Sequence, residues 1–407
     1  MKNIILLTVD TLRRNVLGYY GNKSGLTPFV DSLQDKCIRF TKAQSIGPYT
    51  QASFPGILTS SYYLQYGRGK KLSPKRTLIS EVLQKAGVVT AGFHSNPYLS
   101  DFFGWNRGWD VFYDSMDVEV SSEVPYLKGN EINSKVGEWL SSYTKGNEYR
   151  PFFLWLHYMD VHEPYVPERK YIDMVDPSLN LTREEMFNLF KNVVLKRDVS
   201  DEDRVRVLKK LYNVHVREVD DYIKQFFSLL KELNLLQGSI IIITSDHGDE
   251  FGEHGGLSHD GKMYSELIDV PFLIYDYDKD EGKVCNTLVS NIDVPPTIVH
   301  LFGLEPVKGF EGHSLLPLEE YPEKCCFGEA IGKIGQKEKE TDKPVYFYRE
   351  NDLKIIYRES GNIWEMYNLK EDPKEVNNII DTSSIADDMK EKLRPKIGRW
   401  IKNKSHK

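Results

Sequence analysis

The chain has 407 residues, of which 40% are hydrophobic and 28% are charged, and its formal net charge is −7 at pH 7. These values are typical of a soluble globular protein, and they argue against nucleic acid or an anionic membrane surface as a general partner. Because the length exceeds the usual size of one core, we expect a large domain with a smaller one appended, or two domains that share a face.

The cysteines and the N-terminal residues indicate a reducing compartment. Cys37, Cys285, Cys325 and Cys326 lack the spacing of a metal knuckle, and the adjacent pair cannot easily form an ordinary disulfide. The apolar run at residues 4–7 is too short for a signal peptide, and no stretch approaches the roughly 20 apolar residues of a membrane span. We therefore expect a cytoplasmic protein without stable membrane association.

Short apolar runs alternate with helical patterns along most of the chain. Residues 3–9 predict a strand buried on both faces, and a Thr-Pro pair opens helical spacing over residues 27–37. Further strands are predicted at 88–93, 152–157, 239–244 and 270–275, and a long helix at 204–233. This alternation predicts an α/β fold with a mostly parallel central sheet sandwiched by helices.

The pattern changes toward the C-terminus. Residues 345–348, 353–357 and 363–368 predict antiparallel strands, and residues 384–401 a terminal helix. We therefore predict a catalytic domain at 1–320 and a C-terminal α+β subdomain at 321–407. Residues 333–343 predict a mobile exposed loop, and residues 180–202 predict helical insertions over the sheet that could form a lid.

Side chains suited to metal binding follow several predicted strands. Ligands of parallel sheets gather beyond the carboxyl ends of the strands, where Asp10, Asp160, His162, Asp246 and His247 are expected. The Asp-His-Gly sequence after the apolar run 240–244 is the most informative of these sites, because Asp and His both bind Zn²⁺ and Mn²⁺. The alternative is a capping Asp and a solvated His in an acidic loop.

Eight short segments, spread over nearly the whole chain, carry a further pattern: 7–13, 27–33, 40–43, 157–165, 246–248, 264–271, 292–297 and 367–373. In this order they resemble the sulfatase family, within the alkaline-phosphatase-like group of metal-dependent phospho- and sulfohydrolases. The resemblance implies the α/β fold predicted above, and an ester hydrolase activity.

The family implies a nucleophile at a helix start, in a Cys/Ser-x-Pro-x-Arg pattern followed by Leu-Thr-Gly. Counting back from the Leu-Thr pair at 58 and 59 places Thr50 there, so both the Cys/Ser and the Arg are absent. Sulfatases convert Cys or Ser to formylglycine; threonine cannot undergo this change, and we expect no formylglycine. Thr50 resembles the threonine of phosphoryl-transferring relatives. A helix-capping role for Thr50, and Ser53 as nucleophile, are the alternatives.

The resemblance also implies a metal site of Asp10, Thr50, Asp246 and His247. Thr11 stands where the family often has a second Asp. The mixed oxygen and nitrogen set favours Mn²⁺ or Zn²⁺ over Ca²⁺. For Asp10 the alternative is a helix-capping carboxylate.

Other polar residues are predicted to contact the substrate. His162 matches the family histidine that hydrogen-bonds the sulfate or phosphate, whereas His157 could be a satisfied strand histidine. His259, near the position of a family lysine, or Lys262 could stabilise or protonate the departing oxygen.

Two further positions depart from the family pattern or have an open role. His94 or Asn96 is a weak substitute for the lysine that grips sulfate. His254 is structural in many family members, and a second-metal role is the alternative.

The predicted function is hydrolysis of phosphate mono- or diesters, as in a phosphodiesterase, by attack of Thr50 on phosphorus. The substrate would be a small-molecule or glycan ester, and the protein could be an oligomer. The alternatives are a sulfuric ester hydrolase, a phosphoglycerol-type transferase, and an inactive homologue that binds anions.

Overall fold

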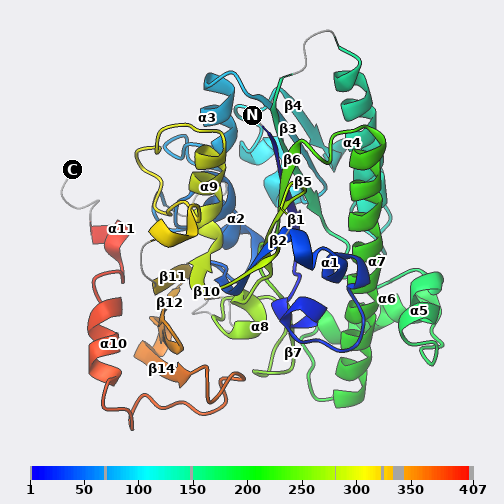
Figure 1. The fold of residues 1–407 in the computed structure, drawn as a ribbon. Coiled ribbons are helices and arrows are strands. Elements are labelled where there is room, and N and C mark those ends of the chain that lie inside the picture. The colour runs from blue at the N-terminus through cyan, green and yellow to red at the C-terminus, as the bar shows by residue number, and fades with distance from the viewer. Residues whose placement is uncertain are drawn as a thin grey trace.

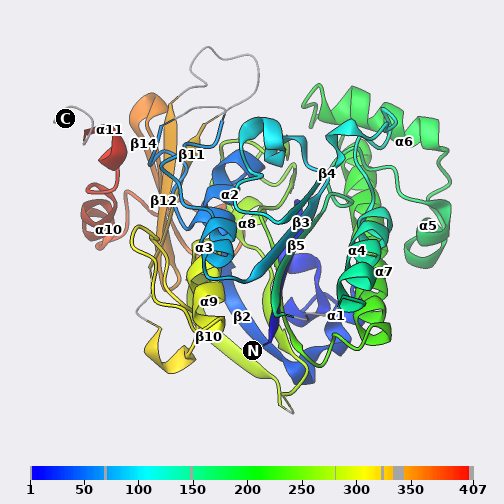
Figure 2. The same cartoon turned by 90° about the horizontal axis from the view of Figure 1, so that it is seen from above.

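The computed structural model describes residues 2–67, 71–146, 150–279, 281–321, 325–332 and 343–402. A central sheet lies between two layers of helices, and a second sheet with α10 forms a further layer beside one of them, as Figures 1 and 2 show. The site described below lies at the carboxyl ends of two strands in the middle of the central sheet.

The central sheet has eight strands in the order β10-β2-β9-β6-β1-β5-β3-β4. Their bounds are β1 Asn3–Val9, β2 Cys37–Gln44, β3 Val89–His94, β4 Val111–Asp114, β5 Phe152–Tyr158, β6 Ser239–Ser245, β9 Phe272–Asp276 and β10 Lys283–Ser290. β9 is antiparallel to β2 and β6, and the other neighbours are parallel. The predicted mostly parallel sheet is confirmed.

Helices cover both faces of this sheet. One layer contains α1 Pro28–Ser32, α4 Gly129–Thr144 and α7 Glu202–Glu232, with α5 Arg169–Val175 and α6 Arg183–Leu189 outside it; the other contains α2 Thr50–Thr59, α3 Ile79–Lys85 and α9 Val294–Leu301 (Figure 2). β1 and β5 are buried along their whole length, which suits strands covered on both faces.

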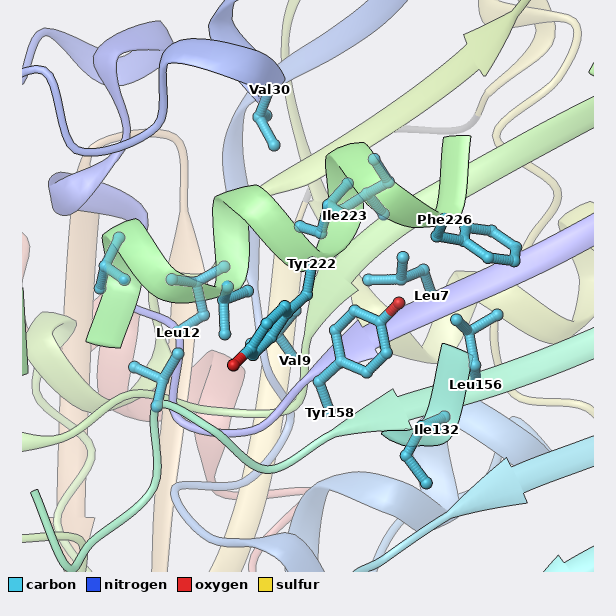
Figure 3. Packing of buried hydrophobic residues seen from close by; sticks show 14 of the residues in the cluster. Leu7, Val9, Leu12, Val30, Ile132, Leu156, Tyr158, Tyr222, Ile223 and Phe226 are labelled. Atoms are coloured by element: carbon cyan, nitrogen blue, oxygen red, sulfur yellow. The ribbon is translucent and has the colours of Figure 1, made fainter. Parts of the chain in front are cut away.

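The core between α7 and the sheet holds the central strands in place. Figure 3 shows Leu7 and Val9 of β1 packing near Tyr222, Ile223 and Phe226 of α7. All five side chains are at most 1% exposed. Each fully buried large apolar side chain contributes about 2 to 3 kcal/mol to the free energy of folding. The packing of α7 against β1 therefore stabilises the position of the strand ends.

A second, antiparallel sheet contains β11 Cys325–Ile331, β12 Pro344–Glu350, β13 Leu353–Arg358 and β14 Ile363–Asn368. The three predicted antiparallel strands are confirmed, and β11 is an additional one. The terminal segment forms two helices, α10 Ala386–Leu393 and α11 Arg399–Lys402, rather than one. The domain boundary after residue 320 stays a prediction.

Several predicted elements have other bounds. The helix predicted at 27–37 ends at Ser32, because a 3₁₀ turn follows and Cys37 already begins β2. β2, β4 and β10 were not predicted, since their half-buried sequences mix polar and apolar residues without clear alternation. Residues 333–342 of the predicted loop lie outside the described residues.

The chain between β6 and β9 forms a small ribbon of β7 Glu250–Phe251 and β8 Leu257–Ser258, followed by α8 Ser265–Ile268. The predicted insertion at 180–202 contains α6 and a π-helical turn, Phe190–Val194. Across the part of the chain that the structure describes, no helix combines the length and the apolar character that crossing a bilayer requires.

Candidate active site

Three side chains of the types that bind metal ions meet where β1 and β6 end side by side. Asp10 follows β1, and Asp246 and His247 follow β6, whose Ser245 pairs with Val9. His247 Nε2 lies 3.3 Å from Asp246 Oδ2 and 3.6 Å from Asp10 Oδ1. All three residues are fully buried. The adjacency of the two strands therefore brings together residues that are far apart in the sequence.

A strained turn holds this arrangement. Thr11 has a φ of 55°, which is unusual for a β-branched residue. Its backbone N–H donates to Asp246 Oδ1 at 3.3 Å, and the N–H of the next residue, Leu12, donates to Ser245 Oγ at 3.0 Å. Such strain persists only where the surroundings impose it. Here the two hydrogen bonds impose it, and they connect the end of β1 to the segment that carries the Asp-His pair.

Thr50 is the first residue of α2 and approaches the same cluster. Its Oγ1 lies 3.5 Å from His247 Nε2 and 3.4 Å from Asn96 Nδ2. Asn96 Nδ2 also donates to Asp10 Oδ2 at 2.8 Å. Tyr49, rather than Thr50, is the N-cap residue of α2. The structure thus brings Thr50 and Asn96 to the predicted ligands, and Thr50 does not cap the helix.

The cluster fits a divalent cation. Asp10 Oδ1 and Asp246 Oδ2 are buried and have no hydrogen-bond partner among the residues that the structure describes. Burial, and next the charge of Asp10, raise the pKa of Asp246 well above its usual value. Two buried carboxyls side by side resist joint ionisation unless a cation neutralises them.

His247 is prepared to act as a neutral ligand of that cation. Its Nδ1–H donates to the carbonyl oxygen of Gly248 at 3.0 Å, which leaves the lone pair on Nε2. Burial, as the largest cause, lowers the pKa of His247 to about 4. The ring is therefore uncharged at neutral pH, as metal ligation requires.

His162 and His259 extend the cluster toward solvent. The ring of His259 lies 4.6 Å from that of His247 and 5.1 Å from that of His162, measured between centroids. The Nδ1–H of His162 donates to the Glu163 carbonyl oxygen at 2.6 Å. This hydrogen bond leaves Nε2 of His162 available to another partner.

Burial and nearby charges separate the pKa values of these two histidines. For His162, the effect of burial is outweighed by the carboxylates of Asp10, Glu163 and Asp249, which raise its pKa to about 9. Burial lowers the pKa of His259 to about 4, despite the carboxylates nearby. His162 is therefore the cationic member of the pair near pH 7, and His259 is the neutral member.

Asp249 is a site residue that the sequence patterns did not single out. Its Oδ1 accepts from His259 Nδ1 at 2.8 Å, and its Oδ2 accepts from the Tyr165 hydroxyl at 2.6 Å. Its backbone oxygen accepts from Arg13 at 3.1 Å. The available signal was its place three residues after Asp246, in a chain segment already rich in ligand-type side chains.

Other candidates are engaged elsewhere. Lys262 Nζ donates to Glu250 Oε2 at 2.7 Å and to the His254 carbonyl oxygen at 3.0 Å, so these contacts do not support its predicted role at the anion. His254 itself contacts Glu266 at 2.5 Å and the carbonyl oxygen of Glu375 at 3.1 Å. This histidine therefore links the loop to the C-terminal part of the chain, and its contacts favour a structural role.

Three more residues have defined structural contacts. Asp160 Oδ2 accepts from the Gly129 amide at 2.8 Å, away from the cluster. His157 contacts Asp10 Oδ2 at 3.2 Å and Thr8 Oγ1 at 2.9 Å, as expected for a satisfied strand histidine. Ser53 Oγ donates to the backbone oxygen of Thr50, at 3.2 Å.

The chain is a hydrolase of the alkaline-phosphatase-like group, as its match to a family model over most of its length shows. The family model described as Sulfatase matches residues 2–304, and that described as N-sulphoglucosamine sulphohydrolase, C-terminal, matches residues 252–403. The chain therefore belongs to the sulfatase family.

Individual relatives agree with this assignment. An arylsulfatase from Clostridium perfringens is 25% identical over 93% of this chain and 90% of its own length. The structure of a phosphonate monoester hydrolase of Agrobacterium radiobacter superposes with a TM-score of 0.79 at 18% identity, covering 99% of this chain and 96% of the other. A structure solved with its substrate D-glucosamine-2-N,6-O-disulfate also gives a TM-score of 0.79, at 20% identity, covering 99% and 98%. At these identities the structures support the fold.

Proposed function

We propose that this protein is a metal-dependent hydrolase of phosphate mono- or diesters that uses Thr50 as its nucleophile. The observation that carries the proposal is the position of Thr50 Oγ1, 3.5 Å from His247 Nε2, beside two buried carboxylate oxygens without partners among the described residues. By its spacing from the Leu-Thr pair at 58 and 59, Thr50 would stand where the family resemblance implies a Cys or Ser for conversion to formylglycine. A threonine there favours direct displacement at phosphorus.

The metal would be held by Asp10, Thr50, Asp246 and His247. Two carboxylates, one hydroxyl and one imidazole suit Mn²⁺ or Zn²⁺ better than Ca²⁺, which prefers about six to eight oxygens. When bound, this cation would favour the alkoxide of Thr50 and neutralise charge on the substrate.

The residues of the chain then divide the chemistry between them. Thr50 Oγ forms a bond to phosphorus while the bond to the leaving oxygen breaks, which gives a phosphothreonine. Asn96 Nδ2, 3.4 Å from Oγ1, orients the nucleophile. His162, whose pKa is raised to about 9, would donate to a non-bridging oxygen of the ester.

His259 would serve the leaving oxygen. Asp249 binds its Nδ1–H, which leaves the lone pair on Nε2, and the ring lies beside the rings of the other two histidines. An anionic ester bound beside it raises the pKa of this imidazole, so that Nε2 can carry a proton to the departing oxygen. In the second step the same nitrogen would accept a proton from the attacking water, which releases phosphate and restores Thr50.

The substrate class follows from the relatives only in outline. Names among the relatives include a choline-sulfatase from Rhizobium meliloti and an N-acetylglucosamine-6-O-sulfatase from Bacteroides thetaiotaomicron. These names favour a small-molecule or glycan ester, and they also support the second candidate, hydrolysis of sulfate esters. The absence of a Cys or Ser at position 50 argues against that candidate.

One set of assays separates the two. The chelated enzyme is supplied with Mn²⁺, Zn²⁺ or Ca²⁺ and offered p-nitrophenyl phosphate, bis-p-nitrophenyl phosphate and p-nitrophenyl sulfate. We expect turnover of a phosphate ester with Mn²⁺ or Zn²⁺, and an acid-stable phosphoryl group on Thr50 in quenched samples, detected by mass spectrometry. Activity confined to the sulfate ester would refute the proposal.

Variants on α2 test the nucleophile. Thr50→Ala should lower kcat by at least about 10³-fold, because removal of a nucleophile leaves only binding and electrostatic contributions. Ser53→Ala is the matched control, since it removes the other candidate hydroxyl from the same helix, and it should retain turnover. A Thr50→Ala enzyme that keeps its kcat, or loss of the adduct in Ser53→Ala alone, would assign the chemistry elsewhere.

A further inference from the structure

An unusual stretch of backbone presents an arginine from the insertion. The π-helical turn Phe190–Val194 precedes Arg197, whose φ is 51°. Both conformations are uncommon, and π-helical turns are frequent at functional sites. The N–H of Arg197 donates to the Val194 carbonyl oxygen at 3.0 Å, and Val193 and Val194 are at most 5% exposed. These buried valines anchor the segment, so the position of Arg197 is well defined.

The guanidinium of Arg197 reaches the loop that carries His259. Arg197 Nη1 lies 3.2 Å from Oδ2 of Asp260, the residue that follows His259. The Asp260 side chain is 5% exposed and that of Arg197 is 33% exposed. Since a guanidinium has several N–H donors in a planar fork, one edge binds Asp260 while the other can bind a second anion.

Arg197 is more exposed than two other basic side chains near this loop, since the side chain of Lys262 is 10% exposed and that of Arg13 is 5% exposed. Lys262 is paired with Glu250 at 2.7 Å, and Arg13 is paired with Glu253 at 2.9 Å. Phe54 stands where the family pattern has its arginine. A phosphate ester carries one or two negative charges, and the buried acids of the site add to the charge that must be balanced.

We propose that Arg197 is a substrate-binding arginine, whose guanidinium shares its N–H donors between Asp260 and the anionic oxygens of the ester bound at Thr50. This inference rests on the proposed function, because it assigns a further ligand to the same anion. It also accounts for the approach of the insertion to the site, since the segment adds a partly exposed cation to the one that His162 supplies.

The test measures binding of inorganic phosphate to the Mn²⁺-loaded protein by titration calorimetry, which requires no turnover. Arg197→Gln should weaken phosphate binding about 10-fold, as expected for loss of a charge-assisted pair. Asp260→Asn should leave phosphate binding unchanged or make it tighter, because it removes the carboxylate that competes for the guanidinium. Arg183→Gln, which removes the other arginine of the same insertion, paired with Glu123 at the surface, is the matched control.

A purely structural tether makes the opposite prediction for Asp260. If Arg197 serves only to fasten the insertion, Arg197→Gln and Asp260→Asn weaken phosphate binding equally, and that result overturns the inference. Unchanged phosphate affinity in Arg197→Gln overturns it as well. Either outcome is independent of Thr50, since a failure of the proposed nucleophile would appear in the kcat of Thr50→Ala and not in this titration.

Discussion

Replacing Asn96 by aspartate would add a carboxylate to the centre of the proposed metal site. Asn96 Nδ2 lies 2.8 Å from Asp10 Oδ2, so the change converts a donor into an acceptor of nearly the same size. Two unit charges about 4 Å apart repel by about 4 kcal/mol at an effective dielectric constant of about 20. Loss of a hydrogen bond to a charged acceptor adds about 2 kcal/mol, and protonation of one carboxyl relieves part of the total.

We therefore expect Asn96→Asp to lower the free energy of unfolding of the metal-free protein by about 3 to 5 kcal/mol at pH 8. Desolvation and the neighbouring acids raise the pKa of the introduced carboxyl in the folded state. The folded state then binds more protons than the unfolded state, so the loss grows with rising pH and shrinks toward pH 4. Urea unfolding in EDTA at pH 8 and pH 5 measures both effects.

Mn²⁺ should reverse the destabilisation. A third carboxylate increases the affinity for a divalent cation, and a ligand that binds only the folded state stabilises it by mass action. The rise in Tm on adding Mn²⁺ should therefore be larger for Asn96→Asp than for the wild type. Asn291→Asp is the control, because Asn291 is buried against Ser45 and Ile46 away from the cluster. If Mn²⁺ rescues both variants equally or neither, Asp10 and Asp246 do not form a cation site.

Two further predictions concern the support of the site. A Cβ at Gly248 would lie 2.1 Å from the Glu266 carbonyl oxygen, so Gly248→Ala should displace the turn after His247. We expect this variant to bind less Mn²⁺ and to have a kcat/KM at least about 10-fold lower than that of the wild type. Wild-type kinetics and metal content would contradict this prediction. For Glu218, the effect of burial is outweighed by the hydrogen bond and charge of His215 and the charge of Lys128, which lower its pKa to about 2. Glu218→Gln should therefore lower the free energy of unfolding by about 3 kcal/mol at pH 7, and this difference should shrink as the pH falls from about 4.5 toward 2. Urea unfolding measures it, and an equal loss of stability at pH 7 and pH 3 would refute the electrostatic explanation.

The sequence was most informative about the centre of the fold. β1, β5 and β6 consist of apolar, largely β-branched or aromatic residues, and their predicted bounds differ from the observed ones by at most one residue. β2 and β10 escaped prediction because they lie toward one side of the sheet and keep polar, partly exposed residues. The spacing of hydrophobic residues predicts a strand only where one or both of its faces are buried. A strand with many partly exposed residues therefore lacks a clear pattern in the sequence.

For the site, the sequence located residues that end strands better than residues that lie on loops. Asp10 and Asp246 were expected from strand ends, because parallel strands bring their last residues to the same end of the sheet, but Asp160, expected there on the same ground, lies away from the cluster. The distance between Thr50 and His247 depends on how α2 packs against the sheet, and the contact between Arg197 and Asp260 depends on an insertion with irregular backbone. Such long-range contacts leave no periodic signal in the sequence.

The two parts of the site differ in burial and in the elements that carry them, and this bears on how the site would work. Asp10, Asp246 and His247 follow strands packed on both faces, so the ligands of the proposed cation are held in place before it binds. The residues proposed to contact the ester, His162 and His259, lie on loops and remain partly exposed. With buried cation ligands at the strand ends and ester contacts on partly exposed loops, the metal site would supply one displacement chemistry while the loops determine which ester enters.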